Sequence, residues 1–199
     1  MLTRSDVLQR VAAGPPGRSN RLLALRPRHR LRAEEGDPVD DNRQLQVSRI
    51  IDAPPERIFA VLADPARHRE LDGAGMLRGL DSGDAPITAA GQAFVMNMNQ
   101  DGIGDYQMRS EIVVYEADRR IGWAPAIHPP GALAHIIGEL DPSGHTYVWE
   151  LEPAGDGRTK VTHTYDWSGV RDQNALGLYP RVSKEQMEGS VDRVAAAVA

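Results

Sequence analysis

The sequence predicts an α+β fold, in which the helices lie on one side of an antiparallel sheet. Three features predict it: a long amphipathic helix at the end, two short helices after the first strand, and short strands separated by turns between them. Helices gathered on one side of an antiparallel sheet bury the apolar face of each element in one core. A strongly curved sheet would wrap the last helix, whose apolar stripe then supplies the opposite wall.

The last helix is predicted over residues 183–198. Ser183 can accept a backbone N–H at the helix start, and Gln186, three residues later, can complete a capping box. The apolar residues that follow have the 4, 3, 4 spacing of one helical face: Met187, Val191, Val194 and Val198. Such a stripe must be buried against another element.

A strand and two short helices are predicted at the start of the folded region. Apolar and polar residues alternate over residues 45–52, as they do in a strand. Pro54 and Pro55 then suit the first turn of a helix, where the missing N–H is not needed. Asp64-Pro65 ends that helix and caps a second one, predicted over residues 67–71.

The region after Gly75 is predicted to form short antiparallel strands joined by hairpins, because Gly, Pro and Asp interrupt it at regular spacing. The predicted strands are residues 76–80, 92–98, 106–116, 121–124, 133–140, 147–151 and 159–167. Residues 125–131 are predicted to be a loop, since they contain consecutive prolines.

Residues 1–43 are predicted to be an extension that precedes a domain of residues 44–199. Residues 1–32 contain eight arginines and one aspartate, whereas the whole chain carries a net charge of −5, so the domain itself is acidic. An acidic domain argues against nucleic acid as the main partner. We expect the extension and its acidic, turn-rich linker to be disordered, and a basic arm for an anionic surface or nucleic acid is the alternative.

Several classes of protein are excluded or disfavoured by composition. The chain has no cysteine, which excludes disulfides and thiolate metal sites. The histidines lack metal-ligand spacing, and neither a Gly-x-Ser-x-Gly elbow nor a phosphate-binding glycine loop occurs. No apolar run approaches the ~18 residues of a membrane span, and the N-terminus lacks the apolar core of a secretory signal. We therefore expect a cytoplasmic protein without a metal or cofactor.

Strand alternation gives candidate residues for an internal cavity, since successive side chains point to opposite faces. The predicted inner faces are rich in methionine and in aromatic residues that carry a polar atom, a mixture that suits a ligand pocket. An ordinary core, in which those polar atoms bond to backbone or water, is the alternative. The candidate ligand-binding residues are Phe94, Met96, Met98, Tyr106, Met108, Ile112, Trp123, Tyr147, Trp149, His163, Tyr165, Trp167, Met187 and Val191. The same alternation places Ser110 and Val114 on the inner face.

Candidate catalytic residues are few. His163, Tyr165 and His135 are the possible acid–base groups, because a neutral imidazole can exchange protons near neutral pH. A histidine in the wall with its hydrogen bonds satisfied is the alternative. Glu139 and Glu150 could form a carboxylate pair, but we interpret them as part of a solvated face.

Two stretches carry a family resemblance. Residues 47–65, VSRIIDAPPERIFAVLADP, resemble the opening of the START-like (Bet v 1-like, SRPBCC) superfamily, which includes the polyketide cyclase/dehydrase and lipid transport family. The end is similar too: residues 149–153, WELEP, then residues 159–167 and the long helix. The resemblance, over about residues 45–198, implies a helix-grip fold: a seven-stranded antiparallel sheet curled around the C-terminal helix, with an apolar cavity between them and two short helices closing one end.

Three functions follow from this resemblance and from the residues. The first, which we expect, is a carrier or sensor that binds an apolar small molecule such as a lipid, a polyketide or an isoprenoid. The second is a polyketide cyclase or dehydratase, which needs a donor near a carbonyl oxygen and a base near the carbon that loses its proton. His163, Tyr165, Tyr106 and Arg109 are the candidate groups for that chemistry. The third is an interaction module that binds through its basic arm.

Overall fold

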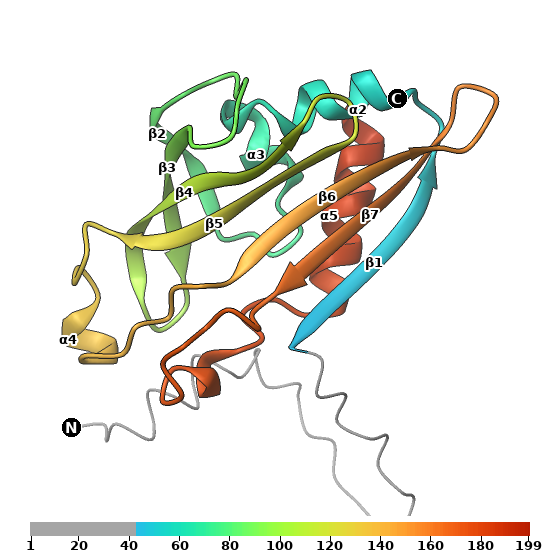
Figure 1. The fold of residues 1–199 in the computed structure, drawn as a ribbon. Coiled ribbons are helices and arrows are strands. Elements are labelled where there is room, and N and C mark those ends of the chain that lie inside the picture. Colours follow the sequence, from blue (N-terminus) through green and yellow to red (C-terminus); the bar gives the residue numbers. More distant parts are fainter. Residues whose placement is uncertain (1–42) are drawn as a thin grey trace, which may run out of the picture.

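The computed structural model describes residues 43–199, so the extension predicted for residues 1–43 lies, apart from Arg43, outside the described residues. The elements in order are β1 Gln44–Ile51, α2 Pro55–Leu62, η1 Pro65–Arg67, α3 His68–Leu71, β2 Leu77–Gly83, β3 Ala93–Gln100, β4 Gly104–Glu116, β5 Arg120–His128, α4 Ala134–Ile137, β6 Thr146–Pro153, β7 Thr159–Asp166, η2 Leu176–Leu178 and α5 Lys184–Ala197. Figure 1 shows the resulting architecture, a curved sheet that wraps α5.

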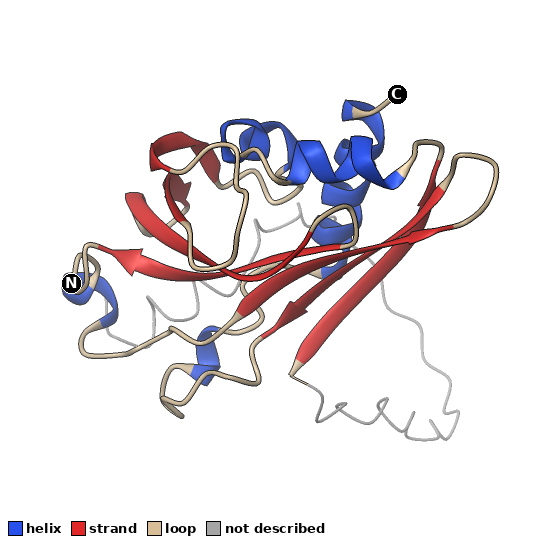
Figure 2. Cartoon of the chain, turned by 45° about the horizontal axis from the view of Figure 1, so that its top comes forward, coloured by secondary structure: helices blue, strands red, loops and turns tan. Residues whose placement is uncertain are grey.

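The seven strands form one antiparallel sheet in the order β1-β7-β6-β5-β4-β3-β2. Strands β2 to β7 are neighbours in sequence as well as in space, and β1 joins the sheet beside β7. In Figures 1 and 2 the helices α2, α3 and α5 lie on one side of this sheet. The predicted α+β class and its helix-grip architecture are therefore confirmed.

Helix α5 begins with the predicted capping box. The hydroxyl of Ser183 accepts from the backbone N–H of Gln186 at 3.3 Å, and the Gln186 side-chain oxygen accepts from the Ser183 N–H at 2.8 Å. The whole predicted apolar stripe is buried, against β1 and the short helices: Met187, Val191, Val194 and Val198. Gly73, after α3, allows the two helices to approach closely, because a Cβ there would collide with the Gln186 carbonyl.

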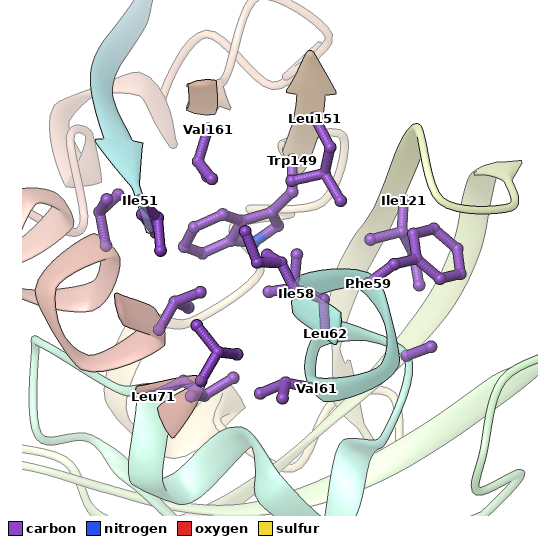
Figure 3. Packing of buried hydrophobic residues seen from close by; sticks show 14 of the residues in the cluster. Ile51, Ile58, Phe59, Val61, Leu62, Leu71, Ile121, Trp149, Leu151 and Val161 are labelled. Atoms are coloured by element: carbon purple, nitrogen blue, oxygen red, sulfur yellow. The ribbon is translucent and has the colours of Figure 1, made fainter. Parts of the chain in front are cut away.

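Helix α2 seals one end of the concave face with apolar side chains. Its proline start is as predicted, and Asp64 caps the following turn by accepting from the Ala66 N–H at 3.0 Å. Ile58 and Leu62 are buried in the main core. Figure 3 shows Trp149 of β6 among the buried side chains of this core, together with Ile58 and Leu62. The strand residues that join them in the same core cluster include Ile51, Ile121, Leu151 and Val161.

Two predicted elements are wrong around residues 125–140. Strand β5 continues to His128 through Pro125, where a loop was predicted. β5 pairs with β6 only from Arg120 to Trp123, so Pro125 lies where the strand has one neighbour, a place that tolerates proline. Residues 133–140, predicted as a strand, contain the short helix α4 instead. The buried Leu133 and Ile137 are four residues apart, a spacing that fits one helical face.

The predicted inward position of Val114 is also wrong, because β4 contains a bulge. The register with β5 shifts between Ile112 and Val114, so the strand alternation inverts beyond that point. Tyr115 takes the inner position instead, and its ring packs edge-on against Phe59, with 5.4 Å between centroids.

Candidate functional site

A cavity of about 190 Å³ lies at the other end of the concave face. A buried water needs roughly 10–15 Å³, so this space exceeds a water site more than tenfold. Strands β2 to β7, α3, α4, the loop before α5 and the first turns of α5 all contribute to its walls. Its lining residues thus come both from the sheet and from helix α5.

Ten of the candidate ligand-binding residues line this cavity. They come from all five strands from β3 to β7 and from α5: Phe94, Met96, Met98, Tyr106, Met108, Trp123, Tyr147, Trp149, His163 and Met187. Ser110, which the alternation also placed inside, lines it too. Methionine and aromatic side chains thus form most of the predicted wall, although a role in ligand binding stays a prediction.

Four candidates lie elsewhere, and their assignment to the cavity wall is corrected. Ile112 and Val191 are buried in the main core, where side chains fill the concave face. Tyr165 is also buried, and its ring stacks on that of Tyr147 with 4.5 Å between centroids. Trp167 packs beside a small second cluster around Val170. Strand alternation, and helical spacing for Val191, placed these residues on an inner face but could not say how far along that face the cavity extends.

His135, a candidate acid–base residue, is not in the wall either. It is exposed on α4, which replaces the strand that was predicted there. Glu139 is exposed just after the same helix, and Glu150 forms an ion pair with Arg120 at 3.0 Å. These two glutamates therefore do not form a carboxylate pair that faces a substrate.

At the inner end of the cavity, His163 is a buried imidazole without a polar partner. Neither of its ring nitrogens has a hydrogen-bond partner among residues 43–199, and the same holds for the indole nitrogen of Trp149. The two rings stack in parallel, with 3.8 Å between centroids. Burial lowers the pKa of His163 to about 3, so the ring is neutral at pH 7. A base with so low a pKa is poorly matched to proton abstraction near neutral pH.

A second polar group lies around Arg181, in the loop before α5. The Arg181 guanidinium donates to the side-chain oxygen of Gln100 at 2.8 Å, and the Tyr106 hydroxyl donates to the same oxygen at 3.4 Å. The backbone N–H of Arg181 donates to the Tyr165 hydroxyl at 3.2 Å. Burial raises the pKa of Tyr106, and the positive charge of Arg181 opposes that rise.

Tyr179 and His145 form a third polar contact in the wall. The Tyr179 hydroxyl donates to the carbonyl of Pro142 and lies 3.0 Å from Nδ1 of His145. That nitrogen is also 3.2 Å from the Pro142 carbonyl, an acceptor, which places the imidazole proton on Nδ1. Burial lowers the pKa of His145 to about 4 and raises that of Tyr179 to about 12, so both are neutral at pH 7.

Sequence reasoning missed His68, His145, Tyr179 and Arg181, all of which line the cavity. His68 starts α3, where its Nε2 lies 2.8 Å from the Leu62 carbonyl and its ring stacks on Trp123 at 4.9 Å. His68 could have been predicted as a lining residue, because it lies in the short helix predicted at residues 67–71, which the family resemblance placed at one end of the cavity. The other three come from turns and irregular loops, which strand and helix periodicity cannot place.

The described part of the chain contains neither a metal centre nor a membrane helix. Within residues 43–199, no group of three or more His, Asp or Glu side chains is arranged to hold a metal ion. No helix in the same residues is long and apolar enough to cross a membrane.

Comparison with curated proteins finds relatives in mycobacteria. The uncharacterised protein Rv0088 of Mycobacterium tuberculosis H37Rv is 32% identical over 137 residues, which are 67% of this chain and 53% of that protein. The chain therefore spans about half the length of the curated relatives it matches.

Solved structures share the fold at low sequence identity. Protein Ms6760 from Mycobacterium smegmatis superposes with a TM-score of 0.56 at 16% identity, covering 78% of this chain and 90% of that one. A protein from Arthrobacter aurescens superposes with a TM-score of 0.55 at 12% identity, covering 79% of this chain and 86% of that one.

The model of one family, described as polyketide cyclase / dehydrase and lipid transport, matches residues 42–199. The chain belongs to this family, as the sequence of residues 47–65 had suggested.

Proposed function

We propose that residues 44–199 bind an apolar small molecule, such as a lipid, a polyketide or an isoprenoid, and that the protein is a carrier or sensor of it. The observation that supports this proposal is the cavity, whose walls are mostly methionine, aromatic and aliphatic side chains with a few polar groups. Such a composition is typical of small-molecule sites. Membership of a family that includes lipid transport proteins points to ligand binding as well.

The polar atoms of the cavity favour binding over an ordinary core. A buried polar atom without a partner costs about 1–3 kcal/mol. His163 and Trp149 leave three such nitrogens buried without a partner among the described residues. Their lack of partners distinguishes this part of the wall from an ordinary core, in which such polar atoms are paired.

The alternative, a polyketide cyclase or dehydratase, has weaker support. His163 was the leading candidate base, and its low pKa argues against that role. The candidate donor Arg109 is exposed and forms an ion pair with Glu111 instead of lining the cavity. Under this alternative His163→Phe should abolish turnover of a polyketide, whereas binding requires only that the cavity remain.

This proposal can be tested by filling the cavity with a larger side chain. Met108 lines it, while Val113, on the same strand β4, is exposed. Met108→Trp should fill the space, and Val113→Trp should not. The full chain, purified from its own host, is examined by native mass spectrometry for a bound molecule and by thermal shift against a panel of lipids and polyketides.

We expect a co-purifying molecule or a thermal shift in the natural protein and in Val113→Trp, and its loss in Met108→Trp. If the natural protein shows neither, the proposal is wrong. Equal binding by Met108→Trp and Val113→Trp would place the ligand outside this cavity.

A further inference from the structure

We propose that the molecule bound in the cavity is an acid, whose anionic oxygens lie at Arg181 and whose apolar body extends inward. This inference rests on the proposed function and adds the chemical class of the ligand. Arg181 is half-buried in the wall, in the loop before α5. No carboxylate within residues 43–199 forms an ion pair with it, although other arginines of that region do, such as Arg120.

The side chain of Arg181 is held in place but not neutralised. The guanidinium donates to the Gln100 amide oxygen, which is uncharged. A guanidinium has five N–H donors in a planar fork, so most of them are left for another acceptor. That fork matches the two oxygens of a carboxylate, and such pairs are among the strongest hydrogen bonds in proteins.

The other groups in this part of the wall do not compete for the guanidinium. Asp72 lines the same cavity, but its two oxygens accept from the backbone N–H groups of Ala74 at 2.9 Å and of Leu77 at 2.6 Å. The nearby hydroxyls of Tyr106 and Tyr179 stay protonated at pH 7, since the ordinary pKa of tyrosine is about 10 and burial raises the pKa of both further. Arg181 is thus the one Arg or Lys among the residues that line the cavity, and Asp72, the one Asp or Glu there, forms no ion pair with it among residues 43–199.

The rest of the cavity selects an apolar body for this acid. Phe94, Met96 and Met187 are nearly fully buried at the inner end, so the wall there offers apolar surface and no counter-charge. The negative net charge of the domain does not oppose binding, because charges farther away than about 8 Å are largely screened at physiological salt. An apolar acid would therefore satisfy both the cation at one end and the apolar surface at the other.

The experiment compares acids with their own methyl esters, which keep the body and remove the charge. Decanoic acid and 1-naphthoic acid, each with its ester, are titrated into the full-length protein. Binding is followed by calorimetry and by the fluorescence of Trp123 and Trp149, which line the cavity. The variants are Arg181→Gln, Arg181→Lys and, as a matched control, Arg78→Gln. Arg78 is exposed on β2 and donates to Asn99 at 3.3 Å, outside the cavity wall.

We expect the acids to bind about tenfold or more tightly than the esters, since a hydrogen bond to a charged group is worth about 1.5–3 kcal/mol. Arg181→Gln should remove this preference by weakening the acids alone, Arg181→Lys should keep part of it, and Arg78→Gln should keep all of it. Equal affinities for acid and ester in the natural protein, or an equal loss of both in Arg181→Gln, would overturn the inference while leaving the proposed function intact. Binding of none of the four compounds would count against both.

Discussion

The two ends of the concave face have the same architecture and opposite contents. Strands β6 and β7 run along both of them. Leu151 and Val161 belong to the core that α2 seals, Trp149 and His163 lie at the boundary, and Tyr147 faces the cavity. Side chains on the same face of the same two strands thus change from aliphatic to polar aromatic within a few residues. We infer from this difference that the packed core at the α2 end supplies most of the stability of the sheet. The other end can therefore contain a cavity.

The largest expected effect is on the free energy of unfolding, and it is tested by shortening one side chain to alanine at each end of the concave face. Ile58→Ala should lower the free energy of unfolding by about 2–5 kcal/mol, because its side chain is fully buried in a well-packed core. Met98→Ala removes a half-buried side chain that already borders empty space, so we expect a loss of less than about 1 kcal/mol. Urea denaturation of both variants measures the contrast. Equal losses would show that the cavity end contributes as much to stability as the core.

The second prediction concerns pH, since the buried histidines lie at the cavity end. The pKa of His163 is lowered to about 3 and that of His145 to about 4, in both cases by burial, from an ordinary value near 6.5. Between about pH 6.5 and 4 the unfolded chain therefore binds protons that the folded chain does not. Stability is fully present above this window and should fall as the pH decreases, by up to about 1.4 kcal/mol per pH unit for each histidine.

The measurement is the free energy of unfolding at several pH values between 4 and 7. His163→Phe should make the dependence on pH shallower, while His135→Gln, on the exposed α4, should not change it. An unchanged slope in His163→Phe would show that this histidine is accessible to protons in the folded protein.

The sequence predicted the local features of single elements better than the extent of the cavity. The capping box of Ser183 and Gln186 and the proline start of α2 are local patterns, and both form as expected. Alternation also placed Met96 and His163 on the correct face. Local patterns succeed there because each concerns residues a few positions apart, whose geometry one element decides.

The cavity needs information that no single element contains. Arg181 comes from a loop without periodicity, and it shares the Gln100 side-chain oxygen with Tyr106 of β4 only because the curved sheet brings this loop and the β3–β4 hairpin to the same space. The predicted inward position of Val114 is wrong for a similar reason. The bulge in β4 inverts the alternation, and nothing in the local pattern of apolar residues indicates the bulge. Strand alternation could identify a candidate wall, but long-range packing decides which part of that wall borders empty space.

The smallest expected effect lies at the boundary between the two ends. His163→Phe keeps a flat ring that can stack on Trp149 at the 3.8 Å spacing, and it removes two buried nitrogens that lack partners among the described residues. Because an unsatisfied buried polar atom is costly, the variant should be as stable as the natural protein at pH 7, or more stable by about 1 kcal/mol. Thermal and urea denaturation of protein freed of bound molecules tests this, with His163→Ala as the comparison that creates a void. A loss of more than about 1 kcal/mol in His163→Phe would mean that the imidazole is hydrogen-bonded in solution, and His163 would then belong to the stabilising core instead of the ligand site.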